Sequence, residues 1–173
     1  MEADRGTIIR LRKLTDSSLI VSWLTEGAGL VRMVAKGARR TRGPFAGKLD
    51  LFVEADVQWA RARRGDLHYL REVAVRDYRL PLRNRYRATL VASYFGFLVE
   101  EMVEEDFPVP EVADLLGRAL DFLQEKDAGM KELLFFESEL AKIAGSDGFK
   151  AQEVKDLGEK SGFRARCVKM LAE

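Results

Sequence analysis

The chain has 173 residues, of which 47% are hydrophobic and 33% are charged. This composition is typical of a globular protein and argues against wholesale disorder. The longest nearly apolar run, residues 90–99, is too short to cross a bilayer, and the first residues lack the pattern of a signal peptide. We therefore expect a cytoplasmic protein with no membrane partner.

Cysteine and histidine are scarce, with one residue of each, Cys167 and His68. A single cysteine excludes an intramolecular disulfide, and the two residues are too few for a zinc site or for Cys–His nucleophilic catalysis. His68 adjoins Tyr69 in a strand-like run, so we interpret it as an ordinary structural residue.

The net charge of +1 hides an asymmetry along the chain. Residues 1–87 contain 19 Lys and Arg against 10 Asp and Glu, whereas residues 88–173 contain 10 against 18. A basic half followed by an acidic half indicates two modules with different partners. The basic half is the expected binder of a polyanion.

The first half of the chain has the alternation of β-strands. Residues 7–13 would place Ile9 and Leu11 on one face and Arg10 and Arg12 on the other. Further strands are predicted over residues 19–24, 30–35, 51–59 and about 67–75.

Five short strands at roughly ten-residue spacing predict a small β-barrel or sandwich. Closing the sheet removes its exposed edges. A five-stranded Greek-key barrel of this size is the OB-fold, which binds oligonucleotides. One side of this barrel would carry Arg10, Arg12, Arg32 and Lys36.

Between the third and fourth strands lies a loop rich in glycine and in cations. Its cations are Lys36, Arg39, Arg40, Arg42 and Lys48. The loop cannot bury itself, because desolvating unpaired cations costs more than a few apolar contacts return. Guanidinium groups bind phosphate bidentately. A phosphate-binding loop and a merely solvated surface loop both remain open.

From about residue 80 the hydrophobic period changes to about 3.6. Val91, Phe95, Leu98 and Met102 form one stripe of a helix that is apolar nearly all round. Further helices are predicted over about residues 112–123, 130–143, 151–157 and 164–171. The sequence thus predicts an α+β chain, with an OB-fold domain over residues 1–79 and an all-α domain over residues 80–173.

Two features of the helical half have simple structural interpretations. The acidic run over residues 100–106 is interpreted as a solvated helix end. The phenylalanines at helical spacing are expected in the core, and these are Phe95, Phe97, Phe122, Phe135 and Phe136. The sequence has no dinucleotide or phosphate-loop fingerprint and no convincing carboxylate pair, so an enzyme is disfavoured.

The residues around the cationic loop resemble a known family. Residues 16–26 (DSSLIVSWLTE) and 29–40 (GLVRMVAKGARR) are similar to the N-terminal domain of the bacterial recombination and repair protein RecO. Residues 6–10 (GTIIR) and Leu51-Phe52 with Val57 also fit this pattern. The resemblance is specific over about residues 6–60 and looser near residues 133–145.

The resemblance implies an OB-fold joined to a helical domain, in a non-enzymatic protein without cofactor. The implied function is to bind single- and double-stranded DNA, to anneal complementary strands and to help RecA replace single-stranded DNA-binding protein (SSB) at the nucleoid. RecR and the acidic, apolar C-terminal tail of SSB are the implied protein partners. RecO proteins commonly carry a four-cysteine zinc module in the helical domain. With only Cys167, this chain lacks the module or retains a remnant over residues 145–162, and no metal is expected.

The predicted phosphate contacts are Lys36, Arg39, Arg40, Arg42 and Lys48, with Arg10, Arg12 and Arg32 extending the path. Phe45 has two interpretations of equal weight: a ring that stacks on a base, or a plug that packs the loop onto the barrel. Arg83, Arg85 and Arg87 either continue the path or simply solvate a helix start, and we favour the latter.

Two other classes of function remain open. One is a protein–protein adaptor whose basic face docks an acidic partner without binding DNA. The other is a metal-dependent nuclease, against which the absence of a recognisable carboxylate motif already counts.

Overall fold

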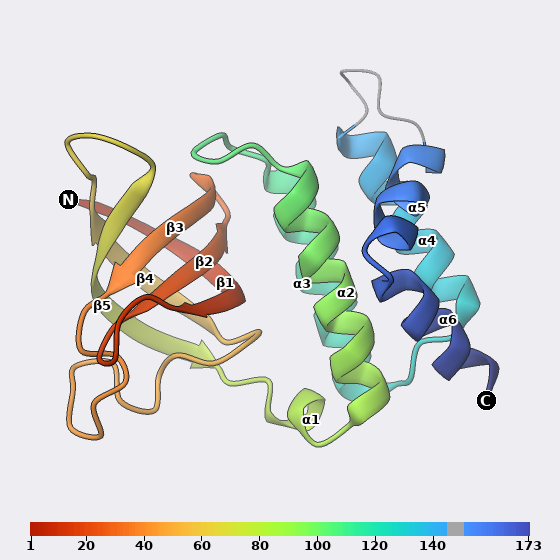
Figure 1. Ribbon diagram of the computed structural model, residues 1–173, viewed down its shortest axis with the longest axis horizontal. Helices are drawn as coiled ribbons and strands as arrows, with labels where there is room; N and C mark the ends of the chain where they lie inside the picture. Colours follow the sequence, from red (N-terminus) through yellow and green to blue (C-terminus); the bar gives the residue numbers. More distant parts are fainter. Residues whose placement is uncertain (145–150) are drawn as a thin grey trace. The chain divides into compact units, whose positions relative to one another are not determined.

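The five predicted strands form a closed barrel in which each strand pairs with two neighbours (Figure 1). They are β1 (Glu2–Lys13), β2 (Leu19–Thr25), β3 (Gly29–Ala35), β4 (Glu54–Ala60) and β5 (Leu67–Asp77). The order around the barrel is β1-β2-β3-β5-β4, with β3 and β5 parallel and the other pairs antiparallel. The predicted OB-fold barrel is confirmed.

The structure, a computed structural model, describes residues 1–144 and 151–173. The chain divides into two units. The barrel unit comprises Met1–Arg79 and Val103–Ala113, and the helical unit comprises Leu80–Met102 and Asp114–Glu173. Residues 103–113, here called the return segment, therefore belong to the barrel although they lie well beyond it in the sequence.

Alternate residues of the strands fill the barrel. Trp23 and Trp59 are the largest side chains of this core, and their exposed fractions are 0% and 1%. The inward residues that alternation predicted for the third and fourth strands are also in the core, and these include Val31, Met33, Ala35, Val53, Ala55 and Val57. Burial of this apolar surface is what stabilises the closed sheet.

The predicted inner face of β1 is wrong at one position, because the strand contains a bulge. Ile8 pairs with Trp23 and Arg10 pairs with Ser22, so Ile9 is the extra residue of the bulge. Ile8 and Leu11 contact the barrel core, whereas the sequence pattern had placed Ile9 and Leu11 together. Arg10 still shares the outer face of β1 with Arg12, as predicted.

A second bulge explains why the pattern of β5 was weak. Gln58 pairs with Glu72 and Trp59 pairs with Leu70, so Arg71 has no partner across the sheet. Leu70 and Val73 reach the core on either side of the bulge. The sequence had placed Tyr69 in the inward phase, but its side chain is 43% exposed.

The five predicted helices follow the barrel, and a short helix that was not predicted precedes them. The short helix is α1 (Leu80–Arg83), and the predicted ones are α2 (Tyr86–Met102), α3 (Pro110–Glu125), α4 (Met130–Ala144), α5 (Ala151–Lys160) and α6 (Phe163–Ala172). α3 begins at Pro110, whose fixed φ suits the first helical position. Before α4, the Gly129 N–H donates to the Glu132 carboxylate at 2.8 Å, which satisfies a backbone donor that the helix leaves free.

Residues 145–150, where the sequence predicted a helix stop and the beginning of a zinc-module remnant, lie outside the described residues. The chain continues into α5 beyond them. Within the described part of the chain, no helix is long and apolar enough to span a membrane.

The helical unit is built around α2 and includes a buried polar group. The Phe95 and Phe136 rings stack with centroids 3.8 Å apart. Glu137 is 0% exposed, and its carboxylate accepts hydrogen bonds from the Tyr94 hydroxyl at 2.7 Å and from two nitrogens of Arg164 at 2.7 and 3.2 Å. A buried carboxylate is tolerated because it is paired in this way.

Two of the phenylalanines that were expected in the core lie at the surface instead. Phe122 is 36% exposed and Phe135 is 55% exposed. They line a pocket of about 220 Å³ together with Arg118 and the buried Phe95. Helical spacing put these rings on the correct elements, but it did not reveal that they lie at the edge of the buried stripe.

Candidate nucleic-acid interface

The segment between β3 and β4 that carries the predicted phosphate contacts, residues 36–48, is here called the basic loop. It is a series of tight turns held by its own backbone. The N–H groups of Arg40 and Gly43 donate to the carbonyls of Gly37 and Arg40 at 3.0 and 3.3 Å, and the Lys48 N–H donates to the carbonyl of Phe45 at 3.0 Å. Gly37 has a φ of 70°, which glycine adopts without strain. The loop therefore presents its cations from a defined backbone.

Phe45 resolves one of the open alternatives. Its side chain is 4% exposed and belongs to the barrel core. The ring packs the basic loop onto the barrel, so it is not placed to stack on a base. We therefore leave Phe45 out of the interface.

The basic loop is also bound to the turn between β1 and β2. The Arg39 N–H donates to the carbonyl of Ser17 at 3.1 Å, and its guanidinium lies 3.4 Å from the carbonyl of Thr15. The Gly37 N–H donates to the Ser18 hydroxyl at 3.4 Å. These bonds hold the loop beside the end of β1, where Arg12 lies.

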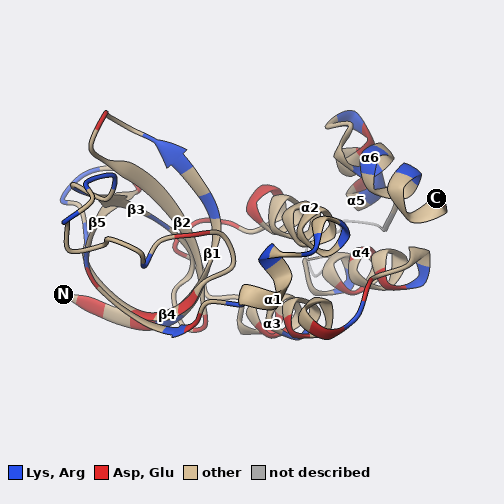
Figure 2. Ribbon diagram, turned by 90° about the horizontal axis from the view of Figure 1, so that it is seen from below, with Lys and Arg blue, Asp and Glu red and all other residues tan. Residues whose placement is uncertain are grey.

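Four of the five loop cations are open to solvent, namely Lys36, Arg39, Arg40 and Arg42. Within residues 1–144 and 151–173, no carboxylate forms an ion pair with Lys36, Arg40 or Arg42. Lys48 is less available, because it is half-buried and its ammonium donates to the carbonyl of Val73 at 3.1 Å. Figure 2 shows Lys and Arg gathered along this loop and at the end of β1.

The strand register defines an outer sheet face next to this loop. One row across β1, β2, β3 and β5 is Arg12–Ile20–Val34–Tyr69, and the row beside it is Arg10–Ser22–Arg32–Leu67. Strands 2 and 3 of the OB-fold, with the loops at their sides, are its usual oligonucleotide-binding surface. The structure therefore brings the predicted Arg10, Arg12 and Arg32 onto one continuous surface.

Arg32 is already engaged on this face. Its Nε and Nη2 atoms lie 2.8 and 2.7 Å from the two carboxylate oxygens of Glu105 in the return segment. The return segment also bonds the barrel through its backbone, since the Asp106 N–H donates to the carbonyl of Leu30 at 2.9 Å. The acidic run is therefore not merely a solvated helix end, as the sequence had suggested, because part of it is fixed to β3.

His68 is a structural residue that helps to hold the return segment. Its exposed fraction is 3%, and its Nε2 lies 3.1 Å from both carboxylate oxygens of Asp106. The Ala62 N–H donates to Nδ1 at 3.1 Å, which places the hydrogen of the ring on Nε2. Within residues 1–144 and 151–173, no group of three or more His, Cys, Asp or Glu side chains is placed to hold a metal ion.

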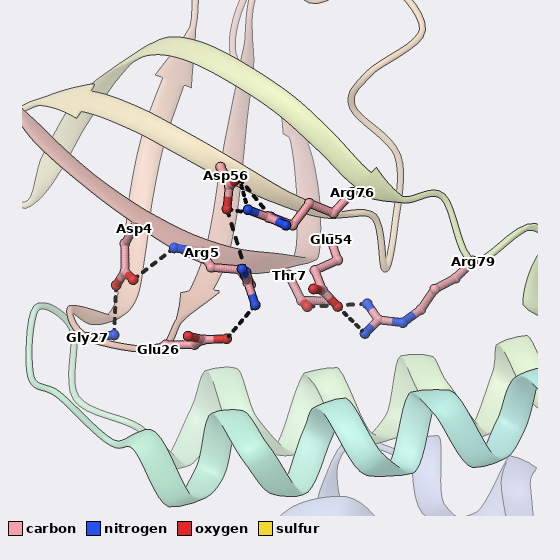
Figure 3. A network of polar contacts seen from close by, with 9 residues as sticks. All are labelled: Asp4, Arg5, Thr7, Glu26, Gly27, Glu54, Asp56, Arg76 and Arg79. Carbon is pink, nitrogen blue, oxygen red and sulfur yellow. Dashed lines mark hydrogen bonds and ion pairs between the residues drawn. The ribbon is translucent and has the colours of Figure 1, made fainter.

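Other cations of the barrel are paired with carboxylates of the same unit (Figure 3). Arg76 donates to both carboxylate oxygens of Asp56 at 2.7 Å, and this hydrogen bonding holds the pKa of Asp56 below its usual value. Arg5 lies 3.6 Å from the same carboxylate. The buried Arg79 donates to the carbonyl of Phe52 and to Glu54, each at 2.9 Å.

One of the three arginines at the start of the helical unit has a role that neither interpretation proposed. Arg85 donates to the carbonyl of Leu123 at 2.8 Å, near the end of α3, and forms an ion pair with Asp127. A cation in this position is favoured by the negative end of the helix dipole. Arg85 therefore stabilises the helical unit, while Arg87 is exposed.

Sequence reasoning missed three exposed residues next to the outer sheet face. Arg63 and Arg64 lie in the turn between β4 and β5, which is one of the loops that OB-folds use in binding. Their signal was present as an arginine-rich turn. The third is Tyr69. The bulge at Arg71 shifts the alternation of β5 by one residue, so the sequence pattern placed Tyr69 inside the barrel although its side chain points outward.

Comparisons with known proteins agree on one family. Residues 1–79 match the family model described as "Recombination protein O N terminal". The chain is 31% identical over 140 residues to a DNA repair protein RecO of Syntrophus aciditrophicus, which covers 81% of this chain and 54% of that protein. It is 33% identical over 124 residues to RecO of Bifidobacterium longum (71% and 52%), and 30% identical over 145 residues to RecO of Rhodopirellula baltica (80% and 51%). The chain thus spans about half the length of these relatives.

Proposed function

Through residues 1–79 the chain belongs to the RecO family, and on this premise we propose that it is a non-enzymatic DNA-binding protein of recombinational repair. It binds single- and double-stranded DNA in the cytoplasm, anneals complementary strands and assists the loading of RecA on SSB-coated DNA. The observation that carries the proposal is the basic loop, whose exposed cations are held beside the outer sheet face of a closed five-stranded barrel.

Annealing needs no catalytic group in this account. Two complementary strands repel each other through their phosphates, and a surface that binds both lowers this repulsion. Arg39, Arg40 and Arg42 supply guanidinium groups that bind phosphate oxygens in pairs. Each neutralised phosphate releases counterions, so the affinity falls as salt rises.

Binding of a labelled single strand over a range of salt concentrations tests the proposal. The variant Arg39→Ala/Arg40→Ala/Arg42→Ala removes three phosphate contacts, and the slope of log affinity against log salt is expected to fall by roughly 2. The matched control Lys131→Ala/Lys160→Ala/Lys169→Ala removes the same charge from exposed positions of the helical unit, and it is expected to keep the wild-type slope.

The same experiment separates DNA binding from the adaptor function. If the basic loop docks an acidic protein and not DNA, wild-type protein shows no binding that an unlabelled oligonucleotide displaces. Displacement by the oligonucleotide, together with a lower slope for the loop variant alone, supports the proposal.

For the helical unit we propose the C-terminal tail of SSB as a partner. The support is the pocket between α3 and α4, which has two exposed aromatic rings, Phe122 and Phe135, and the cation Arg118 at its edge. An apolar side chain fits the pocket. An acidic group of the tail would compete for Arg118 with Asp114, whose carboxylate lies 2.8 Å from the Arg118 Nε in an exposed pair. A tail peptide is expected to bind wild-type protein and to bind the Phe135→Ala variant more weakly.

RecR is proposed as a further partner because the chain belongs to the RecO family. Co-purification of this chain with RecR tests the proposal.

A further inference from the structure

Tyr69 is an exposed aromatic ring on the outer sheet face of the barrel. It lies on β5, directly across from Val34 of β3, and its side chain is 43% exposed. Its sequence neighbours His68 and Leu70 are 3% and 5% exposed, so the strand alternation at this point is clear. The ring therefore projects from the outer sheet face and takes no part in the barrel core.

The neighbours of Tyr69 form an apolar platform that ends at Arg12. The row Arg12–Ile20–Val34–Tyr69 crosses four strands, which is about 14 Å at the usual spacing between strands. Val34 is 8% exposed and Ile20 is half-buried, so both form the floor of the platform. The basic loop adjoins the row near Arg12, and the exposed Arg63 and Arg64 lie just before β5.

The neighbouring row is less accessible to a polyanion. Arg32 is paired with Glu105 of the return segment. The Glu105 carboxylate repels a polyanion and occupies this guanidinium, so we expect a strand to follow the row that contains Tyr69.

We infer that Tyr69 is a base-stacking residue that makes this surface selective for single-stranded DNA. The inference rests on the proposed function and adds a second kind of contact to it. In a single strand the bases are free to leave the backbone and to lie on an aromatic ring, and such stacking is tolerant of sequence. In a duplex the bases are stacked on one another, so the duplex meets the cations of the surface but not the ring.

Measured affinities of variants of the 173-residue chain for an oligothymidylate and for a hairpin duplex test the inference. Tyr69→Ala is expected to bind the oligothymidylate roughly 5- to 100-fold more weakly and to bind the duplex as the wild type does. Tyr69→Phe retains the ring and is expected to keep the wild-type affinity. Tyr78→Ala is the matched control, because Tyr78 is 39% exposed but follows the end of β5.

Two further measurements distinguish stacking from a charge effect or from misfolding. Tyr69→Ala is expected to keep the wild-type salt slope, in contrast to the basic-loop variant, and to bind an abasic deoxyribose phosphate oligomer as well as the wild type does. An unchanged thermal midpoint shows that the barrel is intact.

Two results would refute stacking at Tyr69 while DNA binding stands. One is that Tyr69→Ala binds the oligothymidylate as tightly as Tyr78→Ala does, and the other is that Tyr69→Ala loses affinity for single strand and duplex equally. If wild-type protein binds neither DNA, the proposed function fails and the stacking role fails with it.

Discussion

Arg32 and Glu105, which lie 73 positions apart in the sequence, form a two-point ion pair on the outer face of the barrel, with N–O distances of 2.8 and 2.7 Å. The pair fixes the return segment to β3 and occupies a guanidinium that the sequence had assigned to phosphate. Because this pair of guanidinium donors binds the two oxygens of one anion at a time, Glu105 and a DNA phosphate compete for Arg32.

Glu105→Gln is expected to strengthen the binding of single-stranded DNA by a few-fold, because it removes both a negative charge and a competitor for Arg32. Fluorescence anisotropy with a labelled oligonucleotide measures the change. Glu104→Gln removes the same charge from the exposed neighbouring residue and controls for net charge. Equal affinities for the two variants would contradict the competition.

Gly29 sets how closely the return segment approaches β3. It has a φ of 76°, and a Cβ at this position would lie 1.8 Å from the carbonyl oxygen of Phe107. Gly29→Ala is therefore expected to lower the free energy of unfolding by more than about 2 kcal/mol, since the strain of a left-handed backbone is joined by a backbone clash.

Gly47→Ala is the matched control for this prediction. Gly47 has a φ of 70°, but nothing lies within 4 Å of its Cβ position, so it reports the backbone strain alone. Chemical denaturation of the two variants separates the cost of the backbone strain from the cost of the clash with Phe107. A Gly29→Ala variant no less stable than Gly47→Ala would show that the return segment is not held against β3 in this way.

The two arginines near the end of β5 differ sharply in burial. Arg79 is 2% exposed and is paired with Glu54, whereas Arg76 is about half exposed in its pair with Asp56. Arg79→Met is expected to cost about 3 kcal/mol, because it leaves a carboxylate and a carbonyl without their donor. Arg76→Met is expected to cost much less, because an ion pair that is open to water contributes little to stability. Urea denaturation of both variants checks the difference, and equal losses would contradict it.

Cys167 provides a pH-dependent contribution to stability. Burial raises the pKa of its thiol to about 11. A raised pKa in the folded state stabilises the protein below the pKa of the unfolded chain, and this contribution is lost as pH rises toward 11. Between pH 8 and pH 10 the wild type is expected to lose about 1 kcal/mol more than Cys167→Ala. Denaturant midpoints at the two pH values provide the test, and parallel losses would contradict the prediction.

The sequence predicted the barrel and the helices well, because their patterns are local. The alternation from Val53 to Trp59 and the helical stripe from Val91 to Leu98 each follow a face that is buried in the structure. The cationic loop was found for the same reason, since a cluster of cations near glycines is visible in one short stretch.

The parts that the sequence missed depend on contacts between distant residues. Nothing near Glu105 in the sequence indicates that it pairs with Arg32, and nothing near Phe45 distinguishes an exposed ring from a plug. Bulges at Ile9 and Arg71 shift the strand phase by one residue, which moves a side chain to the opposite face. For this reason Tyr69 was assigned to the inside of the barrel.

Annealing of complementary oligonucleotides at matched salt tests the central claim most directly. Wild-type protein is expected to accelerate annealing, with a rate that falls as salt rises, and the variant Arg39→Ala/Arg40→Ala/Arg42→Ala is expected to lose this acceleration while it remains folded. A folded wild-type chain that neither binds nor anneals DNA would contradict the account, and so would a loop variant that anneals at the wild-type rate.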